Sequence, residues 1–199
     1  MDMEISADLV KRLREMTGAG VMLCKEALRA SKGDLDGAVE YLRKKGTKTA
    51  ESKAGRAAKA GIIGSYIHHN LMLGSLVDLR CETDFVARNE DFRALARELA
   101  MHIATSRPRF LARTQVPPEV VEKEKEIYTE QVKAEGKPPQ AAEKIVAGKM
   151  ESFFKEQCLL DQPFFKDDKV SVADHVKALI ARMGENITIE RFSCFAVGE

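Results

Sequence analysis

Residues 76–89 read LVDLRCETDFVARN and join two kinds of secondary structure. Up to Cys81, apolar and polar side chains alternate, as is typical of a strand with one buried face. After Asn89 the apolar residues recur at helical spacing, at Phe92, Leu95, Ala96, Leu99 and Ile103. Phe85 and its neighbour Asp84 therefore lie at a strand-to-helix junction, where functional residues are more common than inside an element.

A structural role also explains Phe85. Asn89 is a preferred N-cap residue, and an apolar residue before a cap often packs against the helix that follows. The spacing of the apolar residues puts Phe85 at the junction, but it does not show whether the phenyl ring packs against the helix or is exposed. The residues alone therefore leave both roles of Phe85 open.

Residues 5–46 predict three short helices, each with one apolar stripe at helical spacing. The first begins after the candidate cap Ser6, and residues 17–20, TGAG, separate it from the second. The third is expected to end at Gly46. Because each stripe can only be buried against the other two, we expect a three-helix bundle.

We expect a helical domain over residues 1–48, a linker over 49–60 and a core over 61–199. Residues 47–61 around this linker are rich in Lys, Ala and Gly, as solvated tethers are. The core begins with two strands that form an antiparallel hairpin and ends with a strand over residues 187–197. The expected fold class is α+β: an N-terminal three-helix bundle, then a core whose three-stranded antiparallel sheet packs against helices.

Prolines and glycines mark the helices expected in the core. The helix after Asn89 ends before Pro108, and the pairs Pro117-Pro118 and Pro138-Pro139 each open a further helix. The last helix ends at Gly184.

The last strand changes its apolar phase. Ile187 and Ile189 lie on one face of an extended chain, whereas Phe192 and Cys194 lie on the other. Such a shift implies a bulge, or a sheet that is covered on both faces. Because the chain has no spare helices for a second face, we expect a second protomer to cover it.

The composition excludes several classes of partner. The formal net charge of +1 gives no long-range attraction to nucleic acid or to anionic lipid. No apolar run approaches the ~18 residues of a membrane span, and the acidic start does not resemble a targeting peptide. The four cysteines are widely spaced, as in reduced cytosolic proteins. We therefore expect a cytoplasmic protein that binds neither nucleic acid nor membrane directly.

Catalytic and metal chemistry finds little support. His68 and His69 are expected to point to opposite faces of a strand, so they would not share a metal ion. Cys81, Glu82 and His102 could act as nucleophile, acid and base, but a buried cysteine and a surface histidine fit the pattern better. The sequence contains no Walker A or G-x-G-x-x-G motif. We expect no catalytic residue, metal or cofactor.

Two segments together resemble the elongation factor Ts family. Residues 9–28 read LVKRLREMTGAGVMLCKEAL and are similar to the family's N-terminal signature. Residues 81–89 read CETDFVARN and are similar to its core signature, and the ending around residues 184–187, GENI, also fits. The resemblance covers nearly the whole chain, and the length is that of the short members found in thermophilic bacteria.

The resemblance implies a guanine-nucleotide exchange factor that performs no covalent chemistry. Such factors bind the translational GTPase elongation factor Tu and promote GDP release by disturbing its magnesium and phosphate site, so that GTP can be reloaded during elongation. The segment that enters beside the magnesium ion corresponds to Thr83, Asp84, Phe85 and Val86 in this chain.

The resemblance also implies that the N-terminal bundle is ubiquitin-associated-like and grips the GTPase. The contacting positions are Arg14, Val21 and Met22, although this chain has Val21 where the family commonly has methionine and Leu23 where it commonly has aspartate. In short members two protomers pair through their sheets. An alternative function is an adaptor whose bundle binds a ubiquitin-like or peptide partner and whose core is a dimerising scaffold.

Overall fold

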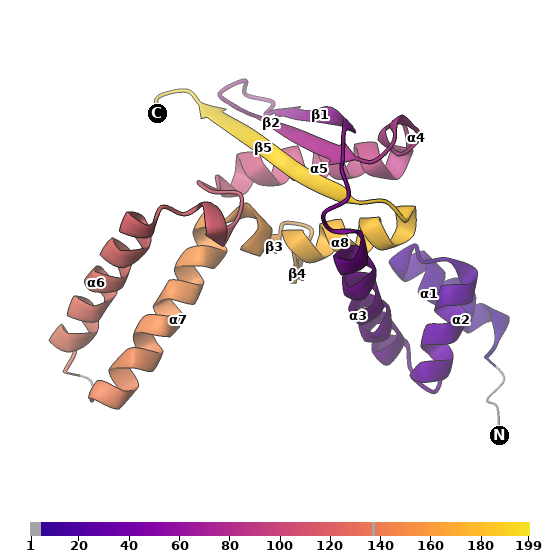
Figure 1. The fold of residues 1–199 in the computed structure, drawn as a ribbon, viewed down its shortest axis with the longest axis horizontal. Coiled ribbons are helices and arrows are strands. Elements are labelled where there is room, and N and C mark those ends of the chain that lie inside the picture. Colours follow the sequence, from indigo (N-terminus) through magenta and orange to yellow (C-terminus); the bar gives the residue numbers. More distant parts are fainter. Residues whose placement is uncertain (1–4, 137) are drawn as a thin grey trace. The chain divides into compact units, whose positions relative to one another are not determined.

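The computed structural model describes residues 5–136 and 138–199 (Figure 1). Its helices are α1 (Ala7–Thr17), α2 (Val21–Ala30), α3 (Leu35–Lys53), α4 (Asp84–Ala87), α5 (Glu90–Ser106), α6 (Pro118–Ala134), α7 (Pro139–Gln157) and α8 (Val172–Met183). Its strands are β1 (Ala60–Ile67), β2 (Leu73–Cys81), β3 (Pro163–Phe164), β4 (Asp167–Ser171) and β5 (Ile187–Ala196). The α+β fold class is confirmed.

The described residues divide into two compact units. The first contains the chain up to Ile62, together with Leu79–Leu95 and Asp174–Thr188. The second contains Ile63–Asp78, Ala96–Ala173 and Ile189–Glu199. The domain boundaries expected from the sequence stay a prediction.

The N-terminal helices of the first unit form the expected bundle. The Leu9 N–H donates to Ser6 Oγ at 3.3 Å, which confirms Ser6 as the cap of α1. Gly18 ends α1 with a φ of 66°, and its N–H donates to the carbonyl of Arg14 at 2.7 Å. The bundle's buried core consists of Leu13, Ala19, Cys24, Ala27, Leu28, Ala38 and Leu42.

Helix α3 is longer than the sequence predicted. It continues to Lys53, past Gly46 and into the expected linker. Gly46 is buried, and a Cβ built on it would lie 3.6 Å from the Cβ of Ala181 on α8. The glycine therefore lies in a close helix–helix contact instead of ending the helix, and Lys48, Ala50, Glu51 and Lys53 in the residues after it favour helix.

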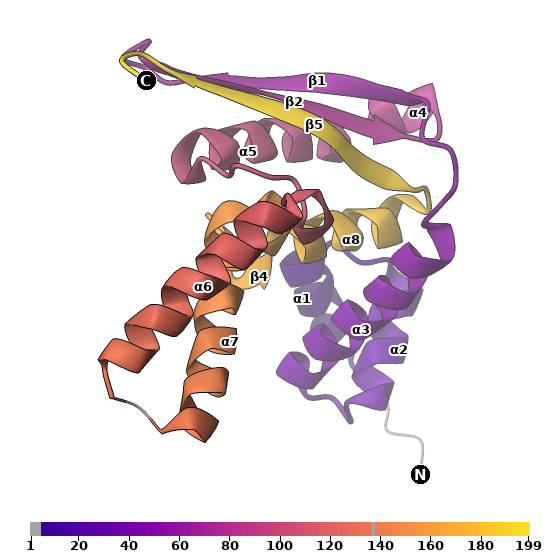
Figure 2. The same ribbon diagram turned by 60° about the vertical axis from the view of Figure 1, so that its left-hand side comes forward.

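A three-stranded antiparallel sheet has the strand order β1-β2-β5. Figure 2 shows α5 running along one face of this sheet. In the second unit, the hydroxyl of Ser75 on β2 donates to the carbonyl of Ala100 on α5 at 2.6 Å. Gly64 on β1 is also buried on this covered face.

The expected phase shift in β5 is confirmed. Ile187 and Ile189 are buried, Glu190 and Arg191 are both exposed, and exposure then alternates in the opposite phase. Arg191 lies 3.5 Å from the carboxylate of Asp78 on β2. Because Asp78 is out of phase with Ser75, this ion pair marks the face of the sheet opposite α5.

Exposed apolar side chains gather on that opposite face, which we call the open face. By strand alternation it presents Ile63 and Ile67 from β1, Leu76 from β2 and Phe195 from β5, all exposed. All four residues belong to the second unit.

Helices α6 and α7 pack side by side as a hairpin (Figure 1). Both begin with proline, as expected. Arg113, from the 3-10 turn Arg113–Gln115, pairs with Glu151 of α7 and with Asp161. None of the helices in the described part of the chain is both long and apolar enough to cross a membrane.

Candidate functional site

The strand-to-helix junction contains an additional helix that the sequence analysis did not predict. The four residues of α4, Asp84–Ala87, lie between β2 and α5. Thr83 caps this turn, and the Val86 N–H donates to its Oγ1 at 3.4 Å. Asn89 is the cap of α5, as expected, since the Asp91 N–H donates to its Oδ1 at 2.8 Å. Phe85 therefore has a helical turn of its own.

The side chains of α4 differ sharply in exposure. Val86 and Ala87 are buried, whereas Phe85 is 79% exposed. An apolar residue that merely packed against the following helix would be covered, so this exposure argues against the structural role that the sequence left open. Asp84 is exposed as well, and its carboxylate accepts a hydrogen bond from Arg88 at 2.8 Å.

A carboxylate from a distant segment holds the start of this turn. Glu185, between α8 and β5, accepts the Thr83 N–H at Oε2 (3.0 Å) and the Thr83 hydroxyl at Oε1 (2.7 Å). In the same place, the Asn186 N–H donates to Glu82 Oε1 at 2.7 Å. Sequence reasoning gave Glu185 and Asn186 no role, and the only signal for them was the GENI ending.

The predicted N-terminal contact residues lie on the outside of the bundle. Arg14 in the last turn of α1 is exposed, and so are Val21 and Met22 at the start of α2. Met22 is 76% exposed. Among the described residues of the first unit, the exposed large apolar side chains are Met16, Val21, Met22 and Phe85. Both predicted binding segments thus contribute to the exposed apolar surface of one unit.

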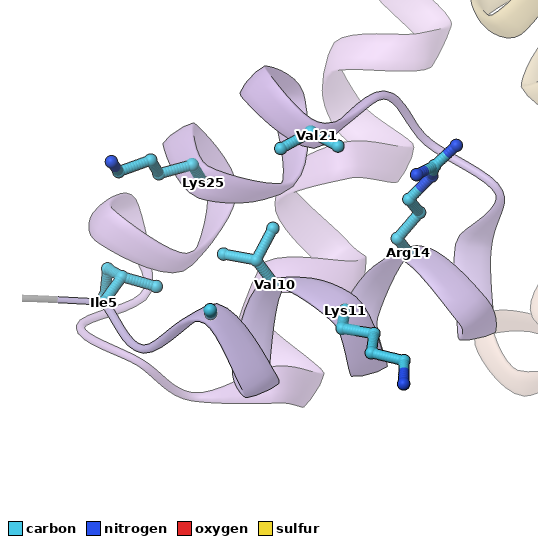
Figure 3. A pocket seen from close by; sticks show the side chains of 7 residues that line it. Ile5, Val10, Lys11, Arg14, Val21 and Lys25 are labelled. Carbon is cyan, nitrogen blue, oxygen red and sulfur yellow. The ribbon is translucent and has the colours of Figure 1, made fainter.

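A shallow hollow lies between α1 and α2, beside these residues. It is lined by Ile5, Ala7, Val10, Lys11, Arg14, Val21 and Lys25. Figure 3 shows Val10 and Val21 facing the hollow, with Lys11, Arg14 and Lys25 around its margin. This side of the bundle therefore combines apolar surface with positive charge.

The surroundings of Cys81 do not suit a nucleophile. Its side chain is fully buried, and burial, helped by the nearby Glu185 carboxylate, raises the pKa of the thiol to about 11. The thiol also donates to the carbonyl of Thr83 at 3.1 Å. Cys81 is therefore a protonated thiol near neutral pH, whereas a nucleophile requires the thiolate.

His102 is buried, so the expectation of a surface histidine is wrong. It lies on α5, where its side chain contacts the segment 162–165. Its Nε2 is 2.8 Å from Gln162 Oε1, and its Nδ1 accepts the Phe165 N–H at 3.3 Å. Burial lowers the pKa of the imidazole. With both nitrogens bonded, His102 is a structural residue rather than a general base.

The expected orientation of His68 and His69 is also wrong. Strand β1 ends at Ile67, so alternation does not extend to these residues, and their ring centroids lie 4.2 Å apart. Nδ1 of His68 is 2.8 Å from the hydroxyl of Tyr66. Within residues 5–136 and 138–199, no group of three or more His, Cys, Asp or Glu could hold a metal ion.

Comparison with known proteins gives a consistent result along the chain. The family model described as Elongation factor TS matches residues 38–199. A protein named Elongation factor Ts from Fervidobacterium nodosum is 54% identical over 197 residues, which cover 99% of this chain and 100% of the relative. Proteins of the same name from Thermotoga neapolitana and Thermodesulfovibrio yellowstonii are also 54% identical, over 99% of this chain and 99% and 98% of their own lengths.

Proposed function

This chain belongs to the elongation factor Ts family, and from that premise we propose that it is the guanine-nucleotide exchange factor of elongation factor Tu. It binds this GTPase in the cytoplasm and promotes GDP release, so that GTP can be loaded during translation elongation. The work is done by binding alone, without a catalytic residue, a cofactor or direct contact with nucleic acid or membrane.

The exposure of Phe85 is the observation that carries this proposal. A phenyl ring that is 79% exposed on a turn with a buried Val86 is presented to a partner at little cost to the fold. Burying such a ring contributes about 1.5–3 kcal/mol, the size of an interface hot spot. Phe85 enters the GTPase beside its magnesium site, flanked by Thr83 and Asp84.

Displacing the surroundings of the magnesium ion weakens the hold on the nucleotide. GTPases bind the phosphates through backbone donors, a lysine and a bridging magnesium ion, and that ion is often the largest local charge. A factor that prefers the nucleotide-free GTPase must lower nucleotide affinity by the same ratio, because the two binding equilibria are linked.

The N-terminal bundle supplies the grip on the GTPase. Met22 and Val21 provide apolar contact and Arg14 provides charge, all on the exposed side of the bundle. These residues hold the factor in place while Phe85 acts.

The open face is where two copies of the chain pair. Ile63, Ile67, Leu76 and Phe195 are exposed there together, and clustered apolar side chains of this kind mark association surfaces. A second copy would present the same face, which is the usual symmetry of homodimers.

The decisive experiment measures release of a fluorescent GDP analogue from elongation factor Tu. We expect rapid release with the unmodified protein and slow release with Phe85→Ala. Phe165→Ala is the matched control, because it removes another exposed ring from a different part of the chain. If GDP release stays rapid with Phe85→Ala, the protein is still an exchange factor, but contacts other than Phe85 cause the release. If the unmodified protein does not accelerate GDP release, the exchange function is wrong and the adaptor function is favoured instead.

A further inference from the structure

We propose that Glu185 is a positioning residue for the Phe85 turn: its carboxylate fixes Thr83, and Thr83 sets the start of the turn that presents the ring. This inference rests on the proposed function, since it concerns how the exchange segment is held. It concerns residues that lie far apart in the sequence, since Thr83 and Glu185 are separated by 102 positions in the numbering.

Helix α4 is too short to be stable by itself. It spans four residues, whereas isolated helices shorter than ~12–15 residues are marginal in water. Its own cap bond, from the Val86 N–H to Thr83 Oγ1, is 3.4 Å long, which is beyond the usual range for such bonds. The conformation of the turn must therefore depend on contacts from other segments.

Glu185 supplies two of these contacts. One carboxylate accepts both donors of Thr83, the N–H at 3.0 Å and the hydroxyl at 2.7 Å. Hydrogen bonds to an ionised carboxylate are roughly twice as strong as neutral ones, and two at once also fix orientation. Thr83 is thus held in the extended conformation, φ −125° and ψ 157°, that lets it cap α4.

The segment that carries Glu185 is itself firmly held. Asn186 is buried, and it donates its N–H to Glu82 and its side-chain Nδ2–H to the carbonyl of Arg56 at 2.8 Å. On the other side, Arg182 at the end of α8 pairs with Asp91 at the start of α5. Glu185 therefore acts from a connection that is tied on both sides.

Phe85 depends on this arrangement because its own side chain is 79% exposed, so the backbone of the turn sets where the ring lies. Val86 and Ala87 are buried and anchor the end of the turn, and Glu185 fixes its beginning. A recognition element that is already in its bound conformation loses less entropy on binding. Without Glu185, the donors of Thr83 would turn to water and Phe85 would reach its binding conformation only part of the time.

A double-mutant cycle tests this role on GDP release from elongation factor Tu. Glu185→Ala should reduce the acceleration about tenfold, in line with the loss of charge-assisted hydrogen bonds, and Glu185→Gln, which keeps one acceptor for Thr83, should reduce it less. In Phe85→Ala protein, removing Glu185 should cost no more than about twofold, since there is no ring left to position.

A role in direct contact or in general stability gives a different result. If Glu185 touched the GTPase itself, its loss would multiply with the loss of Phe85, and that outcome would overturn the proposal. Glu151→Gln is the control for stability, because it weakens the ion pair of α7 with Arg113 and leaves Thr83 and the segment that carries Glu185 untouched; it should stay within about twofold of the unmodified protein. An acceleration by Glu185→Ala equal to that of the unmodified protein would also overturn the proposal.

Amide hydrogen exchange in the free protein separates this inference from the proposed function. Exchange at Thr83, Val86 and Ala87 should become at least about tenfold faster in Glu185→Ala, as local opening becomes easier, and it should be unchanged in Phe85→Ala. This measurement requires no GTPase. Unchanged hydrogen exchange in Glu185→Ala would contradict the positioning role. If the unmodified protein failed to accelerate GDP release from elongation factor Tu, only the proposed function would be contradicted.

Discussion

Gly64 on β1 lies so close to α5 that a Cβ built on it would be 2.5 Å from the carbonyl oxygen of Ala96. The same Cβ would be 2.9 Å from the Cβ of Ala96. Real Cβ atoms do not approach backbone oxygens this closely, so the absence of a side chain at Gly64 sets the separation between the strand and the helix.

Gly64→Ala should therefore destabilise the protein by roughly 1–3 kcal/mol, because the clash is with backbone and β1 would have to move. Urea unfolding measures this directly. Gly74→Ala on β2 is the matched control, since a Cβ there would be 3.4 Å from the nearest atom, the carbonyl oxygen of Tyr66. Equal stability of the two variants would contradict the interpretation of Gly64.

The sequence predicted those features that depend on local chemistry. The cap residues Ser6 and Asn89 make the expected side-chain bonds, and Gly184 ends α8 with a φ of 73°. The phase shift in β5 was also visible, because apolar side chains on a strand report directly on which face is buried.

Features that depend on contacts between distant segments could not be predicted. Gly46 lies inside α3 because α8 packs against it, which local propensity does not reveal. Strands β3 and β4 were missed, since two residues of β3 carry no periodicity. The bond between Thr83 and Glu185 was missed for the same reason: neither residue has a neighbour in sequence that indicates the other.

Stability should fall on mild acidification because of His102. Burial lowers the pKa of its imidazole in the folded protein, so below the ordinary value of about 6.5 the unfolded chain takes up a proton that the folded protein does not. The stabilising contribution is complete above that pH and is lost as pH falls below it, by at most about 1.4 kcal/mol per pH unit.

The measurement is urea unfolding at pH 7.5 and pH 5.5 for the unmodified protein and for His102→Gln. Other titrating groups contribute to both proteins, so the difference between them isolates His102. We expect the unmodified protein to lose more stability on acidification than His102→Gln. Equal losses would show that the neutral form of His102, bonded to Gln162 and to the Phe165 N–H, has no special stability.

Pairing through the open face should be abolished by a charge at its centre. Leu76 lies on the middle strand β2 and is exposed in the single chain, so Leu76→Glu should leave the fold intact. In a symmetric dimer it would bury two unpaired carboxylates, which weakens association by roughly 100-fold or more. Sedimentation at micromolar concentration should show a dimer for the unmodified protein and a monomer for the variant.

Ile127→Glu is the control for that experiment, because Ile127 is an exposed apolar residue on helix α6, which is not part of the sheet. It should sediment as the unmodified protein does. A monomer at every concentration for the unmodified protein would contradict pairing through the sheet, and a dimer that persists in Leu76→Glu would place the interface elsewhere.

The bundle and the Phe85 turn should affect different steps of exchange. Met22→Ala removes apolar contact from the proposed grip and should weaken the affinity for elongation factor Tu about tenfold or more, as loss of an interface anchor does. The maximal rate of GDP release at saturating factor should change little, because the bundle contacts the GTPase equally well before and after GDP leaves. Phe85→Ala should lower the maximal rate itself, since the ring acts on the nucleotide site.

Titrating the factor against elongation factor Tu at constant fluorescent GDP separates the half-saturating concentration from the maximal rate. Arg14→Ala should behave as Met22→Ala does, with an effect that shrinks at high salt because its contribution is electrostatic. Lys44→Ala is the control, as it removes an exposed cation of α3 that pairs with Glu40 on the same helix. A fall in maximal rate without a change in half-saturation for Met22→Ala would mean that the bundle takes part in opening the nucleotide site.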